Sequence, residues 1–384
     1  MKITKLKPAI LVTALASSLG FLVGTASADN LTVALAAEPT SMDPHYQNLT
    51  INNSFATQVY NALVLQDVNQ NLIPGLAISW KPVDDNTWEF KLRSGVKFHN
   101  GAAFSAEDVV ATMQRAANVP NSPSSFGTFI KGKTFEVIDD LTIQVSTEKP
   151  YPFTPNDMSR ISIIDSAFLD ATTEDFNTGV ASFGTGPFTL TKWLPGDLLE
   201  IKRNDSYWGT KVEWDNIIIR PISDGTTRTA ALIAGDVDFI ERVAPADLPN
   251  LASRSGITVF KSVSNRLLYL TLHMTNDPIK PYVTDSNDNP IASPFKDIRM
   301  RKAVSLAINR QAIADRVMDG LSAPAGQFSP QGYIGYSDNL EPDSYDLDRA
   351  KELMAEAGYA DGFKLTMHGP AGRYSNDTRI LEAI

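Results

Sequence analysis

The sequence predicts a mixed α/β fold, and three observations lead to this prediction. Short runs of period two, such as residues 87–92, alternate apolar and polar side chains and are typical of strands with one buried face. Runs of helical period follow, as at residues 106–117, where Val109 and Met113 share one apolar face. Of the 384 residues, 43% are hydrophobic and 20% charged, which suits two domains or one large bilobal domain.

The first third of the chain alternates between the two kinds of element. The expected elements are a strand and loop at residues 31–44, a helix at 55–64, and a hairpin with strands at 87–92 and 96–98. The Asn100-Gly101 turn ends the hairpin, and Ser105 with Asp108, three residues later, predicts a capped helix start. His99 falls on the polar side of its strand beside this turn. We therefore interpret it as a solvated turn residue rather than a metal ligand or a general base.

The middle of the chain predicts a second hairpin, in which residues 184–194 and 198–208 turn at residues 194–197. Residues 214–222 form a continuous β-branched run, typical of a strand covered on both faces. A helix that stops at Gly235 and a further strand come next. Beyond them we expect an apolar crossover strand at 266–274, a proline-rich surface loop at 276–297, helices at 298–308, 310–320 and 346–358, a strand at 363–369, and a helix from 376.

Composition and the first residues point to export. The formal net charge is −10 and basic runs are absent, which argues against nucleic acid and anionic membrane surfaces as partners. Residues 1–28 combine a basic start, an apolar stretch and the small-residue site Ala26-Ser27-Ala28, so we expect a signal peptide cleaved after Ala28. The chain has no cysteine to carry a lipid anchor at that site. We therefore expect a mature, soluble protein in the periplasm.

Motifs for catalysis or metal binding are missing from the sequence. The four histidines are not paired at ligand spacing and there is no cysteine, so no metal or cofactor is expected. Gly184 and Gly186 match the start of a dinucleotide-binding loop, but Pro187 and a strand pattern follow, so this interpretation is rejected. Carboxylates are plentiful, and an exported hydrolase that uses a carboxylate pair remains the alternative hypothesis.

Five blocks of sequence together resemble a known family. They are residues 74–115, 184–209, 230–240, 295–313 and 345–367. In this order they resemble the extracellular solute-binding proteins of the dipeptide, oligopeptide and nickel class, family 5. The resemblance implies a bilobal periplasmic-binding-protein fold of type II, a Venus flytrap with an extra subdomain in lobe one.

The resemblance also implies a domain division. Lobe one is expected at residues 29–264, with a subdomain inserted at about 61–182, and lobe two at residues 265–384. The family's second lobe continues further, so lobe two is expected to be incomplete and the chain to be a piece of a longer protein that, as given, binds ligand poorly.

The implied function is that of the periplasmic substrate-binding component of an ABC importer, not that of an enzyme. Such a protein captures a peptide or peptide-like solute between its lobes and delivers it to permease subunits in the inner membrane. It is expected to be a monomer that does not bind nucleic acid.

Ligand-binding candidates lie in three loops that follow strands facing the expected cleft, since open α/β sheets bind at the carboxyl ends of their strands. The candidates are Thr40, Met42 and Asn53 at the first loop, Arg160 at the second, and Gly369, Arg373 and Tyr374 at the third. By resemblance to dipeptide-binding relatives, Arg373 and Tyr374 are expected to hold a ligand carboxylate.

Each candidate also has a structural interpretation. The first loop can be a proline-stiffened connection in which Met42 only packs. Arg160 can form a buried salt bridge. Arg373 can pair with Asp377 on the surface.

Overall fold

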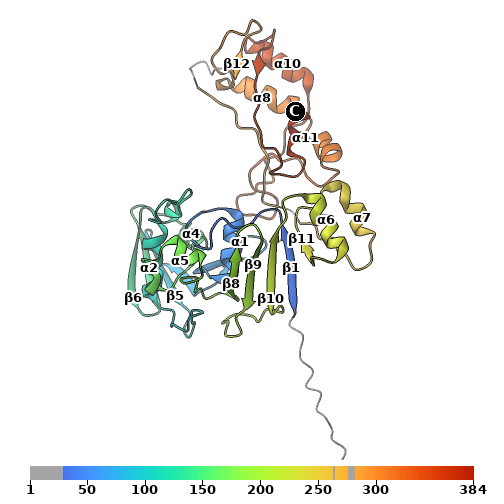
Figure 1. The fold of residues 1–384 in the computed structure, drawn as a ribbon. Helices are drawn as coiled ribbons and strands as arrows, with labels where there is room; N and C mark the ends of the chain where they lie inside the picture. Colours follow the sequence, from blue (N-terminus) through green and yellow to red (C-terminus); the bar gives the residue numbers. More distant parts are fainter. Residues whose placement is uncertain (1–28, 263, 276–281) are drawn as a thin grey trace, which may run out of the picture.

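The computed structural model describes residues 29–262, 264–275 and 282–384, so the expected signal peptide lies outside the described residues. Elements from β1 to α7 form one body, and elements from β12 onward form a second body above it (Figure 1). The chain between α7 and β12 runs from one body to the other (Figure 1).

A five-stranded sheet with the order β11-β1-β10-β9-β8 forms the centre of the first body. β1 (Asn30–Leu35) is parallel to β10 (Asn216–Pro221) and to β11 (Phe239–Ile240). β8 (Phe188–Leu194) and β9 (Leu198–Arg203) form the antiparallel hairpin that the sequence predicts. β10 has a partner strand on each edge, but its residues are at most half-buried, so the predicted coverage of both faces is only partial.

A second, four-stranded sheet has the order β4-β5-β7-β6, and its strands are β4 (Ala77–Pro82), β5 (Thr87–Leu92), β7 (Thr142–Thr147) and β6 (Lys133–Asp139). The predicted return strand at residues 96–98 is wrong. β5 pairs with β4 on one edge and with β7 on the other, so both of its edges are occupied. β7 comes fifty residues after β5, and this distant pairing is invisible in the local pattern.

The helices of the first body begin largely where their caps predict. In α2 (Ala106–Ala116), the Asp108 carboxylate accepts from the Ser105 backbone N–H at 2.8 Å, as predicted. α1 (Thr50–Val59) starts five residues before the predicted helix and ends five before its predicted end, because the chain becomes extended at Tyr60. α6 (Gly225–Ala234) stops at Gly235, whose φ is 80°.

Short elements complete the first body. They are β2 (Val64–Gln66), β3 (Leu72–Pro74), α3 (Gly127–Ile130), α4 (Thr154–Met158), α5 (Thr173–Asn177), α7 (Leu248–Ala252) and the 3₁₀ turns Ser166–Phe168 and Pro245–Asp247.

The second body is built on two helices that pack together. α8 (Ile298–Ala307) and α10 (Leu347–Glu356) bury Ala303, Leu306, Ala350 and Leu353 between them. The other elements are β12 (Val283–Thr284), β13 (Lys364–Leu365), a 3₁₀ turn at Pro294–Lys296, α9 (Arg310–Ala312), a π-helical turn at Ile313–Val317 and α11 (Asp377–Glu382).

Three predictions for this region need correction. The strand expected at 363–369 shrinks to the two residues of β13, and the helix expected at 310–320 divides into α9 and the π turn. Residues 266–274 form no strand within the described chain, and Tyr269 is 65% exposed there. An apolar alternating run becomes a strand only where another strand accepts its backbone hydrogen bonds, and the described residues offer none.

Each sheet of the first body covers its own apolar core. α2 packs Val109 and Met113 against Phe90 and Ile143 of the four-stranded sheet. α1 packs against the five-stranded sheet in a second core. Burial of each such side chain contributes about 1.5–3 kcal/mol, so the two cores supply most of the stability.

The segment around Gly184 lies at the seam between the two cores. The Gly186 N–H donates to the Val59 carbonyl at the end of α1 at 2.9 Å, and a Cβ built at Gly184 would overlap that same oxygen. The backbone at Gly184 lies so close to the Val59 carbonyl that no side chain fits between them. Gly184 therefore serves close packing and not phosphate binding.

We predict that Gly184→Ala destabilises the protein by at least about 2 kcal/mol, since the obstacle is a backbone carbonyl that cannot swing away. Gly225→Ala is the matched control: the nearest atom to its Cβ is an Arg228 nitrogen at 3.6 Å, and we expect its stability to change by less than about 1 kcal/mol. Urea unfolding followed by circular dichroism measures both variants. Equal stability of the two variants would contradict the packing argument.

Candidate functional site

The parallel strands β1 and β10 finish at the same end of the five-stranded sheet, which is its carboxyl edge, and β1 runs toward the second body (Figure 1). The loop of residues 36–45 leaves β1 at this edge. The turn between β8 and β9 reaches the same edge, where the Glu38 carboxylate accepts from the Gly196 N–H at 2.8 Å. Loops from three strands therefore meet where open α/β sheets present their ligand sites.

The first part of this loop is exposed and polar. Thr40 donates its hydroxyl to Gln47 at 2.7 Å and accepts from the Asn52 amide at 3.0 Å. Asn53 donates to the Asn48 side chain at 2.9 Å from the adjoining helix α1. Thr40 thus shares a small polar network with Gln47 and Asn52, and Asn53 forms a separate contact with Asn48.

The second part of the loop is buried. Met42 has no exposed surface and packs in the core under the five-stranded sheet. The structure gives Met42 the packing position that was its alternative interpretation, and a residue without surface cannot touch a ligand there.

A buried ion pair fixes this loop from below. Arg115 of α2 donates to both carboxylate oxygens of Asp43, at 2.9 and 2.7 Å, and also to the Nδ1 of His45 at 3.0 Å. His45 Nε2 donates to the Ser162 carbonyl at 2.7 Å, which leaves Nδ1 as the acceptor. Thr173 of α5 donates to Asp43 at 2.8 Å. The pair therefore joins the loop to α2 and α5.

Burial and charge set the protonation of this cluster. Burial alone would raise the pKa of Asp43, but the Arg115 guanidinium outweighs it and holds that pKa below its usual range. Burial lowers the pKa of the His45 imidazole from 6.5 to about 4, and the Arg115 charge works in the same direction. The folded state thus contains neutral His45 beside an ionised pair.

We predict that the protein loses stability as the pH falls from 7 to 4.5. The unfolded chain protonates His45 near pH 6.5 and the folded one only near pH 4, so the stabilisation is complete above pH 6.5 and is lost toward pH 4. The complete shift in the pKa of His45 corresponds to about 3 kcal/mol of the free energy of unfolding. His45→Gln, which cannot titrate, should show a shallower loss in urea titrations at the two pH values. Parallel losses in both proteins would refute the assignment.

His99 is not the solvated turn residue that the sequence suggested. It is half-buried, its Nε2 donates to the Gly186 carbonyl at 3.0 Å, and its Nδ1 accepts from the Gly184 N–H at 3.2 Å. Burial lowers its pKa. The sequence interpretation failed because these partners lie 85 or more residues further along the chain. His99 therefore holds the seam together.

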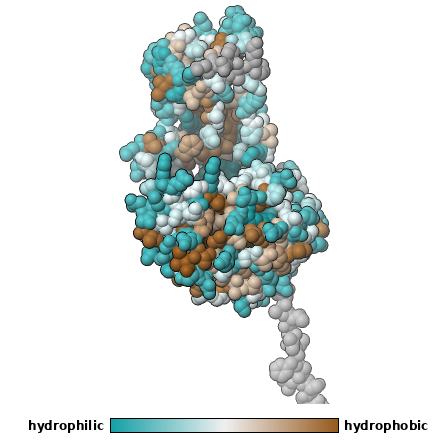
Figure 2. Space-filling model, turned by 90° about the vertical axis from the view of Figure 1, so that its left-hand side faces the viewer, coloured by the Kyte–Doolittle hydropathy of each residue, from teal (hydrophilic) through white to brown (hydrophobic). Residues whose placement is uncertain are grey.

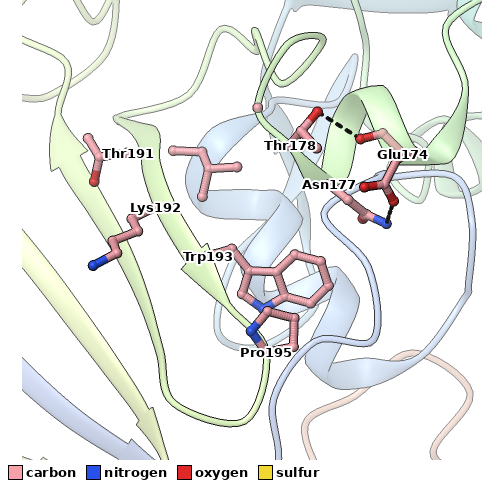
Figure 3. Close-up of a pocket in the computed structure, with 9 residues that line it drawn as sticks. Glu174, Asn177, Thr178, Thr191, Lys192, Trp193 and Pro195 are labelled. Carbon is pink, nitrogen blue, oxygen red and sulfur yellow. Dashed lines mark hydrogen bonds between the residues drawn. The ribbon is translucent and has the colours of Figure 1, made fainter.

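A hollow of about 510 Å³ lies between α5 and β8 (Figure 3). Glu174, Asn177 and Thr178 line it from α5, and Lys192, Trp193 and Pro195 line it from β8 (Figure 3). The Asn177 side-chain oxygen accepts from the Met42 N–H at 2.9 Å, so the hollow adjoins the loop of residues 36–45. The sequence analysis did not predict this hollow, because its lining residues carry no motif.

Arg160 follows α4 and has an exposed side chain. The buried salt bridge considered for it is not what the described residues show, because the neighbouring carboxylate of Asp157 pairs with Lys133 at 2.7 Å. Arg160 follows the buried Met158 by two positions and precedes the buried Ile161, and both of these residues belong to the core of the four-stranded sheet.

The loop of residues 368–377 in the second body is organised by one carboxylate. Asp377 accepts backbone N–H bonds from Gly372, Arg373 and Tyr374 at 3.1, 2.9 and 3.0 Å. The Arg373 guanidinium lies over the Tyr374 ring, 5.4 Å from its centroid, instead of pairing with Asp377. At Gly369, a Cβ would meet the Leu381 side chain of α11, so this glycine permits close packing of the loop on that helix.

Two bodies, each with an α/β arrangement and a polar loop at the junction, define a bilobal binding protein, and comparison with known proteins supports this class. The structure superimposes on a periplasmic binding protein DppA from Helicobacter pylori in complex with a peptide, with a TM-score of 0.70 and 24% identity, over 87% of this chain and 67% of that one. It also superimposes on AgaA from A. tumefaciens in complex with agropinic acid, with a TM-score of 0.70 and 25% identity, over 92% and 69% of the chains. The fold is that of the type II periplasmic binding proteins.

Sequence comparison identifies the family. Residues 71–384 match the bacterial extracellular solute-binding proteins, family 5, and the chain belongs to this family. The glutathione-binding protein GsiB of Salmonella paratyphi A is 30% identical over 372 residues, which are 96% of this chain and 69% of that protein. GsiB of Escherichia coli K12 is 29% identical over 376 residues. The resemblance seen in the sequence is confirmed, and this chain is a substrate-binding protein of ABC transporters.

Two features are absent from residues 29–262, 264–275 and 282–384. No helix in these ranges is long and apolar enough to cross a membrane. In the same part of the chain, no cluster of three or more His, Asp or Glu side chains is placed to hold a metal ion.

Proposed function

We propose that this protein captures a peptide or peptide-like solute between two lobes and delivers it to the permease subunits of an ABC importer. The observation that carries the proposal is the exposed guanidinium of Arg373, held beside Tyr374 by a loop that is folded around Asp377. Such a group can take a carboxylate in two parallel hydrogen bonds, and the tyrosine hydroxyl can add a third.

The two lobes of the proposal are residues 29–264 and 265–384, with a subdomain at about 61–182 in the first. The separate cores of the two sheets and the packing of α8 on α10 support this division. Between the two bodies the space-filling surface is hollowed, with apolar residues visible inside (Figure 2). Thr40 and Asn53 would meet the ligand from the edge of the lobe-one sheet, while Gly369, Arg373 and Tyr374 would meet it from lobe two.

Closure of the two lobes follows when the ligand makes more contacts in the closed form than in the open form. A ligand that touches both lobes binds the closed form more tightly than the open one and so shifts the population toward closure. The buried Asp43–Arg115 pair keeps the lobe-one loop in place, so that Thr40 is already oriented before the ligand arrives. Arg160, which belongs to the subdomain, is the next cation to consider if Arg373 does not bind ligand.

The relatives support a peptide-like ligand. GsiB, at 30% identity over 96% of this chain, is named for glutathione, which is a tripeptide. The hydrolase alternative finds no support in the relatives, since the family and the neighbouring structures are transport proteins. We propose that the protein has no enzymatic activity, and recovery of a bound peptide unchanged after prolonged incubation tests this.

We predict that Arg373→Ala weakens the binding of trialanine by at least about thirtyfold, because removing one partner of a desolvated charge pair costs roughly 2–5 kcal/mol. The C-terminal amide of trialanine should bind the unmodified protein as weakly as trialanine binds the variant. Isothermal titration calorimetry measures all pairs. Arg379→Ala, which removes an exposed cation from α11 in the same body, should leave affinity within about threefold. Unchanged trialanine affinity in Arg373→Ala would show that the carboxylate binds elsewhere.

We also propose that the protein is exported to the periplasm, loses its signal peptide after Ala28 and carries no lipid. Periplasmic family members and the sequence of residues 1–28 support this. We predict that the protein released by osmotic shock begins at Asp29. Amino-terminal sequencing of the released protein checks this, and a start at Met1 would show that export does not involve cleavage.

A further inference from the structure

Two arginines meet on the tyrosine of the proposed ligand loop. Arg373 comes from the loop itself, and Arg266 comes from the segment that runs between the two bodies (Figure 1). The Arg266 guanidinium lies 5.1 Å from the centroid of the Tyr374 ring, and that of Arg373 lies 5.4 Å from the same centroid. The two residues are 107 positions apart in sequence, so the fold alone brings these charges together.

Neither guanidinium is neutralised within the described chain. Other arginines there donate to an acidic side chain, as Arg299 does to Asp297 and Arg349 does to Glu352. In the described residues, Arg266 and Arg373 have no ion-pair partner, and each guanidinium lies over the Tyr374 ring. Both side chains are exposed, while Tyr374 is half-buried.

This arrangement leaves the donors available. A guanidinium above an aromatic ring gains a cation–π contact, while the N–H groups at its edge still point outward. Two like charges at one ring also repel each other, and an anion placed between them relieves that repulsion. The protein carries an excess of acidic residues, 44 against 34 basic ones, yet no acidic side chain of the described residues pairs with either of these two arginines.

We infer that Arg266 is a second anion-binding residue of the ligand site and that it selects peptides with a second carboxylate next to the terminal one, as in a peptide ending in glutamate. The inference rests on the proposed function, in which Arg373 takes the terminal carboxylate. Arg266 then contacts the side-chain carboxylate of the last residue. Tyr374 orients both guanidinium groups and is a positioning residue in this respect.

The two arginines belong to one lobe. Arg266 and Tyr374 both lie in residues 265–384, which are lobe two in the proposed division, so a ligand that engages both arginines is held by that lobe. The selectivity for an acidic C-terminal residue would therefore appear directly in affinity.

Calorimetry with two tripeptides tests the inference. Ala-Ala-Glu and Ala-Ala-Gln have the same shape and differ by one charge, so their affinity ratio reports the second anion site. We expect the unmodified protein to bind Ala-Ala-Glu at least about tenfold more tightly. Arg266→Met should reduce the ratio to below about twofold while changing the affinity for Ala-Ala-Gln by less than about threefold. Arg373→Met should weaken both peptides by a similar factor and keep the ratio.

Three further variants distinguish direct contact of Arg266 with the ligand from a general effect of positive charge. Arg379→Met removes a positive charge from the same body without touching Tyr374 and should keep the tenfold ratio. Tyr374→Phe keeps the ring and should also keep the ratio, whereas Tyr374→Leu should lower it, because both guanidinium groups lose their support.

The outcomes that overturn the inference are distinct from failure of the proposed function. Equal binding of the two peptides by the unmodified protein overturns the role of Arg266 and leaves a peptide receptor. Loss of the ratio in Arg379→Met as large as in Arg266→Met shows a diffuse field and also overturns it. Binding of neither peptide overturns the proposed ligand class and the inference with it.

Discussion

The buried pair of Asp43 and Arg115 is the interaction on which the first body depends. It joins the loop after β1 to α2, and through Thr173 to α5, so three segments more than fifty residues apart share one carboxylate. A buried pair of this kind adds little net stability, because desolvation of the two charges offsets their attraction, but removal of one partner leaves an uncompensated buried charge. The role of the pair is to hold the loop after β1 in position against α2 and α5. The first part of the loop, with Thr40, can face a ligand because the ion pair of Asp43 and Arg115 fixes the buried second part.

The seam between the two cores uses backbone instead of charge. Gly184 and Gly186 press against the end of α1, and His99 holds both from the other side. Asn61 adds a further tie, since its side-chain oxygen accepts from the Thr185 hydroxyl and the Trp208 indole, both at 3.0 Å. Two histidines, His45 and His99, thus share one arrangement in which Nε2 donates to a carbonyl and Nδ1 accepts. Protonation of Nδ1 would set a donor against a donor, which links the integrity of the seam to pH.

The second body contrasts with the first in its charge. The loop proposed to bind ligand is organised by backbone donors to Asp377, no acidic side chain of the described residues pairs with Arg373, and Arg266 reaches the Tyr374 ring from the connecting segment. Polar contacts from the first body, and arginines with no ion-pair partner in the described chain near the second, suit a binding protein that recognises an anionic end of its ligand. Membership in the family explains why such a trap exists, and the side chains at the junction decide what it holds.

The sequence by itself determined the elements whose signals are local. The Ser105–Asp108 cap, the Gly235 stop, the β8–β9 hairpin and the family blocks all depend on neighbours in the chain, and each was predicted correctly. Tertiary structure decided what depends on distant partners. β7 displaced the expected return strand from β5, residues 266–274 found no strand to pair with in the described chain, and Met42 went into the core. The meeting of Arg266 and Arg373 on Tyr374 belongs to the same group. Hydrogen-bond pairing and contact between residues far apart in sequence leave no periodic trace, so only the folded chain could reveal them.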